Sequence, residues 1–208
     1  EQFGLSSDKY SLIAEGIYEK GFTYGSLKFG AKHIQSFTKQ EVQQNGVFKS
    51  DLNQMETSVF SEWNHSKDKF SCSLGLKANR VHFSNISINK SYYNFLPKAM
   101  LGYRLNENSF IRYDVEMSQT NPTLVELTDT EIRLDPYLAE RGNLLLKPYS
   151  NLNNNLFYEH KKGLFTFNAN LRHHYKHNPI MESVKEQGNI FLIIPENMKS
   201  WNKYNAEM

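Results

Sequence analysis

LFTFNANLRHHYK, residues 164–176, alternates between two kinds of side chain at every step. Its odd positions carry Phe165, Phe167, Ala169, Leu171, His173 and Tyr175, whereas its even positions after Leu164 carry only amides, cations, a hydroxyl and an imidazole. A period of two places successive side chains on opposite faces of a β-strand. The segment therefore predicts a strand with one polar face and one apolar face bounded by aromatic residues.

The same alternation recurs along the chain. It is clear in Tyr93–Leu105, where Pro97 has no N–H to donate and so predicts a bulge or a local gap. Weaker alternation covers Tyr10–Glu19, Thr23–Ser36, Met55–His65, Phe70–Phe83, Phe110–Ser118 and Leu152–His160. A ninth strand over Ile190–Ile194 and a tenth starting near Ser200 complete an all-β, antiparallel up-and-down meander of about 8–10 long strands.

The predicted links between strands alternate in length. Tight polar turns are expected at 20–22, 66–69, 106–108 and 161–163, and longer links at Phe37–Gln54, Ser84–Tyr92, Gln119–Asn151 and His177–Asn189. Within the third long link, Val125–Leu127 and Pro136–Arg141 predict single helical turns. In an up-and-down sheet this order puts the tight turns at one rim and the loops at the other, as in outer-membrane barrels.

Strand length favours a membrane barrel over a soluble sheet. Phe165 and Tyr175 are separated by about 33 Å of extended strand at roughly 3.3 Å per residue. A tilt of about 40° projects this length to about 25 Å, the height of the apolar band of such barrels. We therefore expect the chain to form part of a large outer-membrane β-barrel.

The composition of the chain limits which partners and which kind of membrane segment it can have. Lys plus Arg number 24 and Asp plus Glu 22, so the net charge of +2 gives no basic surface for nucleic acid. No stretch approaches the roughly 20 apolar residues of a spanning helix. The lone Cys72 excludes an internal disulfide. The chain begins at Glu1 without a secretory signal, which predicts a mature form or an excised fragment.

The middle of the chain resembles TonB-dependent outer-membrane receptors of the type common in Bacteroidetes. The matching stretches are Tyr93–Pro97, Leu101–Asn106, Arg112-Tyr113, Ser118, Asn121–Leu127, Leu134–Tyr137, Gly142–Tyr149, Tyr158–Pro179, Asn178–Ile180 and Pro195–Asn197. Leu144 stands where the family usually has proline, and the first ninety residues match only in pattern.

The resemblance implies a barrel of about 22 strands around a plug. We expect one partial barrel domain over residues 1–208, without the plug, in the bacterial outer membrane. The resemblance further implies import of a siderophore, haem, vitamin, glycan or peptide. The implied partners are outer-membrane lipid, the TonB energy-coupling complex acting through the plug, and an extracellular lipoprotein; no cofactor is expected.

Two sets of residues are candidates for ligand contact. Arg112, Asp114, Glu116, Asn168, Asn170 and Arg172 share the polar strand faces and are predicted to line the lumen. The loop Gln119–Tyr149 is too apolar for a solvated tail and contains three prolines, so it is predicted to be the most ordered long loop, at the outer rim. Its Tyr137, Arg141 and Tyr149 are predicted to contact a ligand, or else to pack on the rim.

No catalytic or metal-binding constellation is visible. Asp114 and Glu116 share a strand face, as a glycosidase pair would, but a hydrated lumen beside Arg112 explains them more simply. The adjacent His173 and His174 must point to opposite faces. We therefore expect no enzyme and no metal site.

One alternative stays open at this point. A self-contained soluble β-barrel or sheet that binds a small apolar ligand would show the same alternation. It would turn Phe165, Phe167, Ala169 and Leu171 inward, whereas a membrane barrel turns them outward to lipid.

Overall fold

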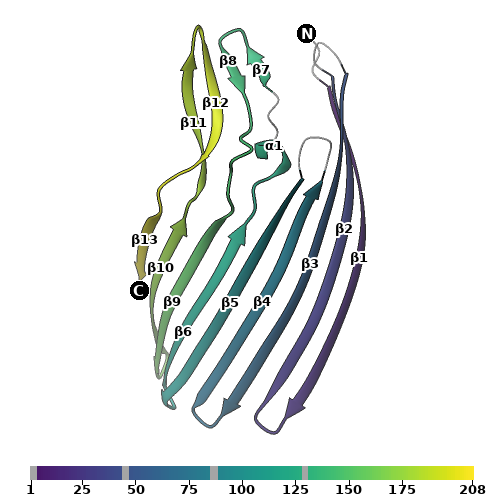
Figure 1. The fold of residues 1–208 in the computed structure, drawn as a ribbon. Helices are drawn as coiled ribbons and strands as arrows, with labels where there is room; N and C mark the ends of the chain where they lie inside the picture. The colour runs from purple at the N-terminus through teal and green to yellow at the C-terminus, as the bar shows by residue number, and fades with distance from the viewer. Residues whose placement is uncertain (1–3, 44–46, 85–88, 128–130) are drawn as a thin grey trace. The chain divides into compact units, whose positions relative to one another are not determined.

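The computed structural model describes residues 4–43, 47–84, 89–127 and 131–208. Most of these residues lie in strands (Figure 1). The strands are β1 (Gly4–Phe22), β2 (Gly25–Gln43), β3 (Val47–Lys67), β4 (Phe70–Ser84), β5 (Asn89–Asn106), β6 (Ser109–Thr120), β7 (Ile132–Asp135), β8 (Leu138–Glu140), β9 (Tyr149–Lys162), β10 (Phe165–His177), β11 (Ile180–Gln187), β12 (Ile190–Asn197) and β13 (Trp201–Glu207). The helix α1 covers Leu124–Leu127.

The strands form two sheets. Nine of them follow the order β1-β2-β3-β4-β5-β6-β9-β10-β13, which confirms the predicted antiparallel meander. The other four form a smaller sheet with the order β11-β12-β8-β7. We call this small sheet, together with α1, the cap.

Two-residue turns join the predicted hairpins. β1 and β2 are separated by Thr23-Tyr24, slightly later than predicted, and β5 and β6 by Glu107-Asn108. Asp68 and Gly163 open the other two turns with φ values of 52° and 60°. Glycine and aspartate tolerate this left-handed conformation, so these residues suit tight hairpins.

The predicted long links Phe37–Gln54 and Ser84–Tyr92 are wrong in extent. β2 continues to Gln43 and β3 starts at Val47, while β5 starts at Asn89. Residues 44–46 and 85–88 lie outside the described part of the chain. Polar sequences such as Lys39-Gln40-Glu41 pair as strands through their backbones, and the apolar alternation that marks a half-buried strand is not needed there.

Pro97 affects pairing without ending its strand. β5 runs through it, and the β5–β6 register begins at Lys98, the next residue. The register shift lies between Arg104 and Asn106 instead.

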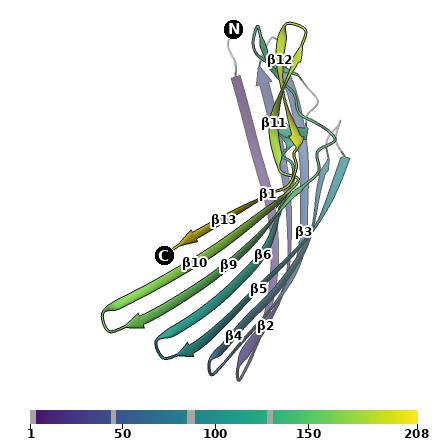
Figure 2. The same ribbon diagram turned by 90° about the vertical axis from the view of Figure 1, so that its left-hand side faces the viewer.

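The two real long connections fold into the cap. Residues 121–148 join β6 to β9 and supply α1, β7 and β8, whereas residues 178–200 join β10 to β13 and supply β11 and β12. Figure 2 shows the β11–β12 hairpin extending beyond the end of β10 while β13 returns beside β10. Since β10 starts at the Gly163 turn, the cap lies at the opposite end of these strands from that turn.

Two predictions within these connections need correction. Ile190–Ile194 is not the ninth barrel strand: it lies in β12, which pairs with β11 and, in parallel, with β8. β13 is instead the ninth strand of the large sheet. The helical turn at Val125–Leu127 is confirmed, but Pro136–Arg141 forms the β7–β8 turn and β8, because the Asp135 side chain accepts a hydrogen bond from the Tyr137 N–H at 2.7 Å.

A small apolar core lies in the cap. Ala139, Leu192 and Ile194 are buried together, with Ile190 packed against them. The strands of the large sheet instead leave many large apolar side chains exposed, among them Tyr18, Phe165 and Tyr204 at 63%, 83% and 69%. Apolar exposure on this scale marks a surface that contacts lipid or another protein.

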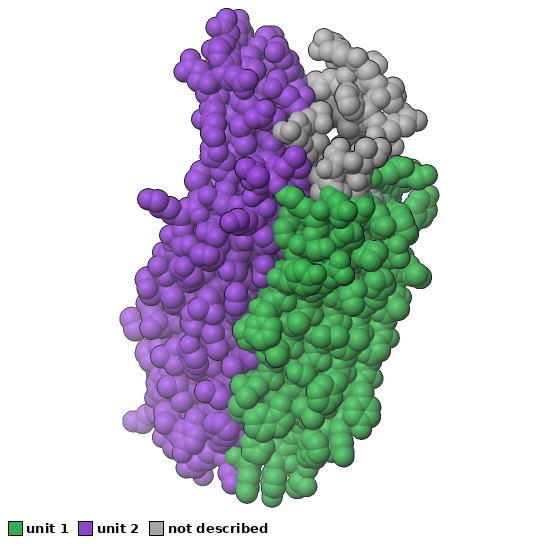
Figure 3. Space-filling view, viewed as in Figure 1, with its two compact units in different colours: residues 1–67, 72–97 green, residues 68–71, 98–208 purple. Residues whose placement is uncertain are grey.

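The chain divides into two compact units (Figure 3). Unit 1 contains residues 1–67 and 72–97, and unit 2 contains residues 68–71 and 98–208. Whether residues 1–208 act as one domain therefore stays a prediction. Within the described residues, none of the helices has the length and apolar character needed to cross a membrane.

Candidate functional site

The strand register of unit 2 brings the predicted lumen residues onto one face. Asp114 on β6 lies opposite Asn155 on β9, which lies opposite Arg172 on β10. Residues directly opposite one another in an antiparallel sheet share a face. The resulting polar face contains Arg112, Asp114 and Glu116 of β6, Asn153, Asn155 and Glu159 of β9, Asn168, Asn170, Arg172 and His174 of β10, and Lys203, Asn205 and Glu207 of β13.

Ion pairs and amides connect the middle of this polar face. The Arg112 Nε donates to Asp114 Oδ2 at 2.9 Å, and the Asn155 amide donates to the same oxygen at 3.4 Å. Arg172 pairs with Glu207 at 3.4 Å. With its amide turned to satisfy both neighbours, Asn170 donates to Asn155 and accepts from Arg172. Two ion pairs thus offset charge within the face, which is rich in groups that bind water or a polar solute.

The opposite face of the same strands is apolar over most of its length. It carries Leu101, Tyr103, Ile111, Tyr113, Val115, Leu156, Tyr158, Phe165, Phe167, Ala169, Leu171, Tyr204 and Ala206. We call these residues the apolar face.

The paired histidines occupy opposite faces, as predicted. On the apolar side, the His173 ring nitrogens contact Asn154 and Asn202 and its ring stacks on Tyr204 at a centroid distance of 4.6 Å. On the polar side, His174 contacts Asn153 at 2.7 Å. Among the residues that the structure describes, no three metal-binding side chains converge.

The three predicted loop contacts lie on different elements. Tyr137 is 68% exposed at the β7–β8 turn, and its carbonyl accepts the Phe191 N–H. Arg141 follows β8, and its N–H donates to Ile193. Tyr149 starts β9, where the Lys176 ammonium lies 5.2 Å from its ring centre. The structure therefore shows no common site for these residues, and their contact with a ligand stays a prediction.

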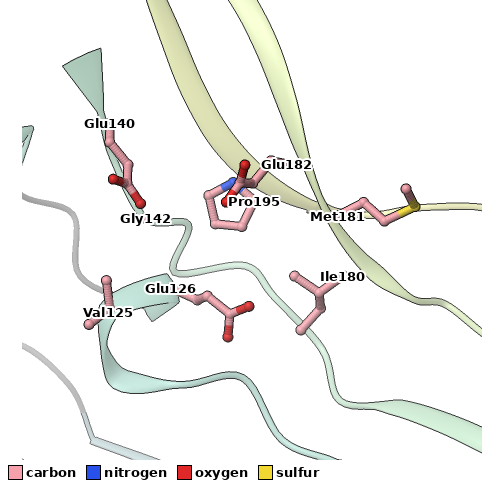
Figure 4. Close-up of a pocket in the computed structure, with 8 residues that line it drawn as sticks. All are labelled: Val125, Glu126, Glu140, Gly142, Ile180, Met181, Glu182 and Pro195. Atoms are coloured by element: carbon pink, nitrogen blue, oxygen red, sulfur yellow. The ribbon is translucent and has the colours of Figure 1, made fainter. Parts of the chain in front are cut away.

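The cap contains an open pocket that the sequence did not reveal. Its volume is about 440 Å³, and it is lined by Val125, Glu126, Glu140, Gly142, Ile180, Met181, Glu182 and Pro195. Figure 4 shows the Ile180 and Glu126 side chains extending towards one another across it. The lining comes from both long connections, so the pocket exists only because they fold together.

Glu126 also stabilises α1. Its carboxylate accepts hydrogen bonds from the Thr123 N–H at 2.7 Å and the Thr123 hydroxyl at 2.8 Å. The Glu126 N–H lies 3.3 Å from the same hydroxyl and donates to it, which completes a reciprocal capping box. The Thr-x-x-Glu spacing of Thr123 and Glu126 could have predicted the start of this helix from the sequence, but not the pocket.

An ion pair crosses the β11–β12 hairpin. The Lys185 ammonium donates to Glu196 at 2.5 Å, and this bond, with one from Ser183, holds the pKa of the Glu196 carboxyl below its ordinary value. A lowered folded-state pKa means that the stabilisation is present above the ordinary pKa. It is lost as the pH falls through the folded-state pKa. Glu196 is solvent-accessible, so salt should screen this pair.

We expect Asp114→Asn to lower the free energy of unfolding by less than about 1 kcal/mol, because half-exposed ion pairs contribute little. The Arg112 and Asp114 side chains are 43% and 33% exposed. Denaturant unfolding of the intact protein in lipid vesicles measures this change. A loss of several kcal/mol would contradict a hydrated polar face.

Comparison with known proteins assigns the chain to a family. A family model described as "Outer membrane protein beta-barrel family" matches residues 13–208. No curated protein matches the chain. The match extends over nearly the whole chain, including both units and the cap.

Solved structures share the fold at low sequence identity. The copper transporter OprC superposes with a TM-score of 0.74 at 10% identity, over 98% of this chain and 35% of OprC. A variant of the ferric enterobactin receptor PfeA from Pseudomonas aeruginosa gives 0.69 at 17% identity, over 97% of this chain and 33% of the receptor. The siderophore receptor PirA from Pseudomonas aeruginosa gives 0.61 at 12%, over 98% and 46%.

The chain thus spans between a third and a half of the length of these proteins. At such identities the likeness extends to the fold alone. The fold agrees with the family match, and the chain therefore belongs to the outer membrane protein beta-barrel family and lies in the bacterial outer membrane.

Proposed function

We propose that this chain forms part of the transmembrane barrel of a TonB-dependent outer-membrane receptor that imports a solute. In this proposal the apolar face contacts lipid and the polar face lines the lumen. Arg112, Asp114, Glu116, Asn168, Asn170 and Arg172 then border the solute pathway, as polar side chains line the interior of such barrels. The role of these residues is binding and passage rather than catalysis.

The observation that carries the proposal is the cap. Two connections separated by the whole of β9 and β10 fold into one small sheet and line an open pocket of about 440 Å³. Binding sites are commonly concave and built from loops held by a rigid scaffold. A folded cap at the loop end of the strands is well placed to capture a solute before it enters the barrel.

The soluble alternative does not fit the family. A soluble barrel would turn Phe167 and Leu171 inward, but a member of an outer-membrane barrel family has lipid to cover them. The similar proteins are named as a siderophore receptor, a ferric enterobactin receptor and a copper transporter, which favours a metal or metal chelate among the candidate solutes. Energy coupling would require TonB acting through a plug, and an extracellular lipoprotein stays a proposed partner.

Filling the cap pocket should impair uptake. We expect Ile180→Trp in the full-length receptor to reduce uptake at limiting solute at least several-fold, because the indole occupies the space towards Glu126. Val184→Trp is the matched control, since Val184 lies four residues further along β11 and is 64% exposed outside the pocket lining. Growth of a receptor-deficient strain on defined iron and carbon sources identifies the solute, and labelled uptake then compares the variants. Equal uptake by both folded variants would refute a role for the pocket.

A further inference from the structure

A second hollow lies in unit 1. Its volume is about 550 Å³, and its lining is mostly apolar. The lining residues are Thr57, Ser58, Val59, Ala78, Asn79, Arg80, Tyr93, Asn94 and Phe95. The small Ala78 side chain leaves space beside Val59 and Phe95, which are 56% and 59% exposed. We call this hollow the groove.

The groove opens on the apolar side of the strands. Lys77 and Asn79 on β4 both reach Glu56 on β3, at 3.9 and 3.1 Å. Alternation therefore turns Ala78 and Arg80 to the other side, together with Thr57 and Val59. That side carries Tyr10, Leu12, Tyr18 and Phe22 of β1, Phe29 and Phe37 of β2, and Trp63 of β3. It is the side that faces lipid in the proposed barrel.

Arg80 differs from the cations on the other side of unit 1. There, Lys28 pairs with Glu19 at 3.5 Å and Lys32 with Glu15 at 3.7 Å. Arg80 has no carboxylate partner among the described residues. Its guanidinium donates to the Ser91 hydroxyl at 3.2 Å and lies 5.8 Å from the Tyr93 ring centre. Several of its five N–H donors are thus available to an anion.

The position of Arg80 along β4 places it at the edge of the expected apolar band. Phe70 begins β4 directly after the Asp68-Lys69 turn, and Arg80 lies ten residues later. This distance corresponds to about 33 Å along the strand and to about 25 Å across the membrane at a tilt of about 40°. With Phe70 at the turn-side border of the apolar band, Arg80 lies at the loop-side border. Tyr93, 72% exposed, lies beside it, as aromatic residues do at such borders.

Arg80 has no carboxylate partner among the described residues, and at the edge of a lipid-facing surface the anions within its reach are those of the membrane. We propose that Arg80 and the groove bind a phosphate-bearing lipid of the loop-side leaflet. The guanidinium holds the headgroup phosphate with charge-assisted hydrogen bonds, assisted by the Ser91 hydroxyl. An acyl chain lies in the groove over Ala78, between Val59 and Phe95. This inference rests on the outward orientation of the apolar side and requires no particular solute.

Native mass spectrometry of the full-length receptor with added phosphatidylglycerol tests the inference. We expect Arg80→Gln to weaken lipid binding about tenfold, the effect of losing one charge-assisted contact. Ala78→Phe should weaken it by filling the groove while the charge remains. Lys32→Gln is the matched control because it removes a cation from the other side, and it should bind as the wild type does.

Two further ligands test whether binding needs the headgroup phosphate and whether free phosphate can replace the lipid. Uncharged diacylglycerol should bind at least tenfold more weakly than phosphatidylglycerol, and inorganic phosphate should not displace the lipid at equal concentration. Equal lipid binding by folded Arg80→Gln and wild type, or displacement by inorganic phosphate alone, would overturn the inference. Solute uptake is measured separately, and uptake without lipid binding would refute this site while leaving the proposed function intact.

Discussion

Leu171→Arg should lower the free energy of unfolding of the barrel by about 2–4 kcal/mol, the cost of a cation at the midplane of the lipid face. Leu171 is 51% exposed on β10 and lies opposite Leu156 and Ala206. It is six residues from Phe165, near the middle of the predicted apolar band. Here an arginine has no carboxylate beside it and is far from either membrane border.

The matched control is Asn168→Arg on the same strand. Asn168 belongs to the polar face and lies opposite Glu159, so a cation there gains a partner and stays hydrated. We expect its effect to be less than about 1 kcal/mol. Denaturant unfolding of the full-length receptor in lipid vesicles compares the two variants. A large loss for Asn168→Arg with none for Leu171→Arg would invert the assignment of the faces. Spin labels at Ala169 and Asn170 provide an independent measurement of which side contacts acyl chains.

The strands that cross the membrane could be predicted from the sequence. With lipid on one side of a strand and polar surroundings on the other, apolar and polar side chains alternate with a period of two. This alternation can be recognised within a single segment of sequence. Residues 164–176 correspond to β10 within one residue at each end, and Tyr93–Leu105 lies wholly inside β5. Turn chemistry at Asp68 and Gly163 adds a second local signal.

Outside the membrane that constraint ends, and prediction fails there for a physical reason. Residues 39–43 continue as strand although they have no apolar alternation. Ile190–Ile194 is apolar at every position, so its period cannot show which sheet it joins. Its parallel pairing with Leu138–Glu140 connects segments about fifty residues apart, and no local pattern records such a contact.

The candidate site, too, could be predicted only in part. Asn168, Asn170 and Arg172 could be assigned to one face because they alternate along a single strand. Asn155 lies on the neighbouring strand, and its place on the same face follows only from the register between β9 and β10. The cap pocket was missed because Glu126, Glu140 and Glu182 belong to separate segments. A residue-level prediction of that pocket would have required the fold of both connections first.

Two asparagines add side-chain hydrogen bonds to the β8–β12 pairing that joins these connections. The Asn143 side chain donates to the Pro195 carbonyl at 3.0 Å and accepts the Leu145 N–H at 2.9 Å. The Asn197 side chain donates to Lys147 and Asn178 carbonyls at 3.0 and 2.9 Å and accepts the Lys147 N–H at 2.9 Å. Each amide thus bonds backbone groups of the cap on more than one segment.

We expect Asn197→Ala to destabilise the cap by about 1–3 kcal/mol, since it removes three hydrogen bonds, of which the one to the Asn178 carbonyl is part-buried, and each contributes about 0.5–1.5 kcal/mol. Amide exchange of the full-length receptor should then accelerate about tenfold or more in residues 138–148 and 190–197. Exchange in β9 and β10 should not change, because their ladders do not depend on the cap. Asn143→Ala should act similarly, and the double variant should lose less than the sum, since both amides hold the same two connections together. Asn189→Ala, at the exposed tip of the β11–β12 hairpin, is the control. Uniform acceleration across β9 and β10, or none in the cap, would contradict a stabilising role of these two side chains in the cap.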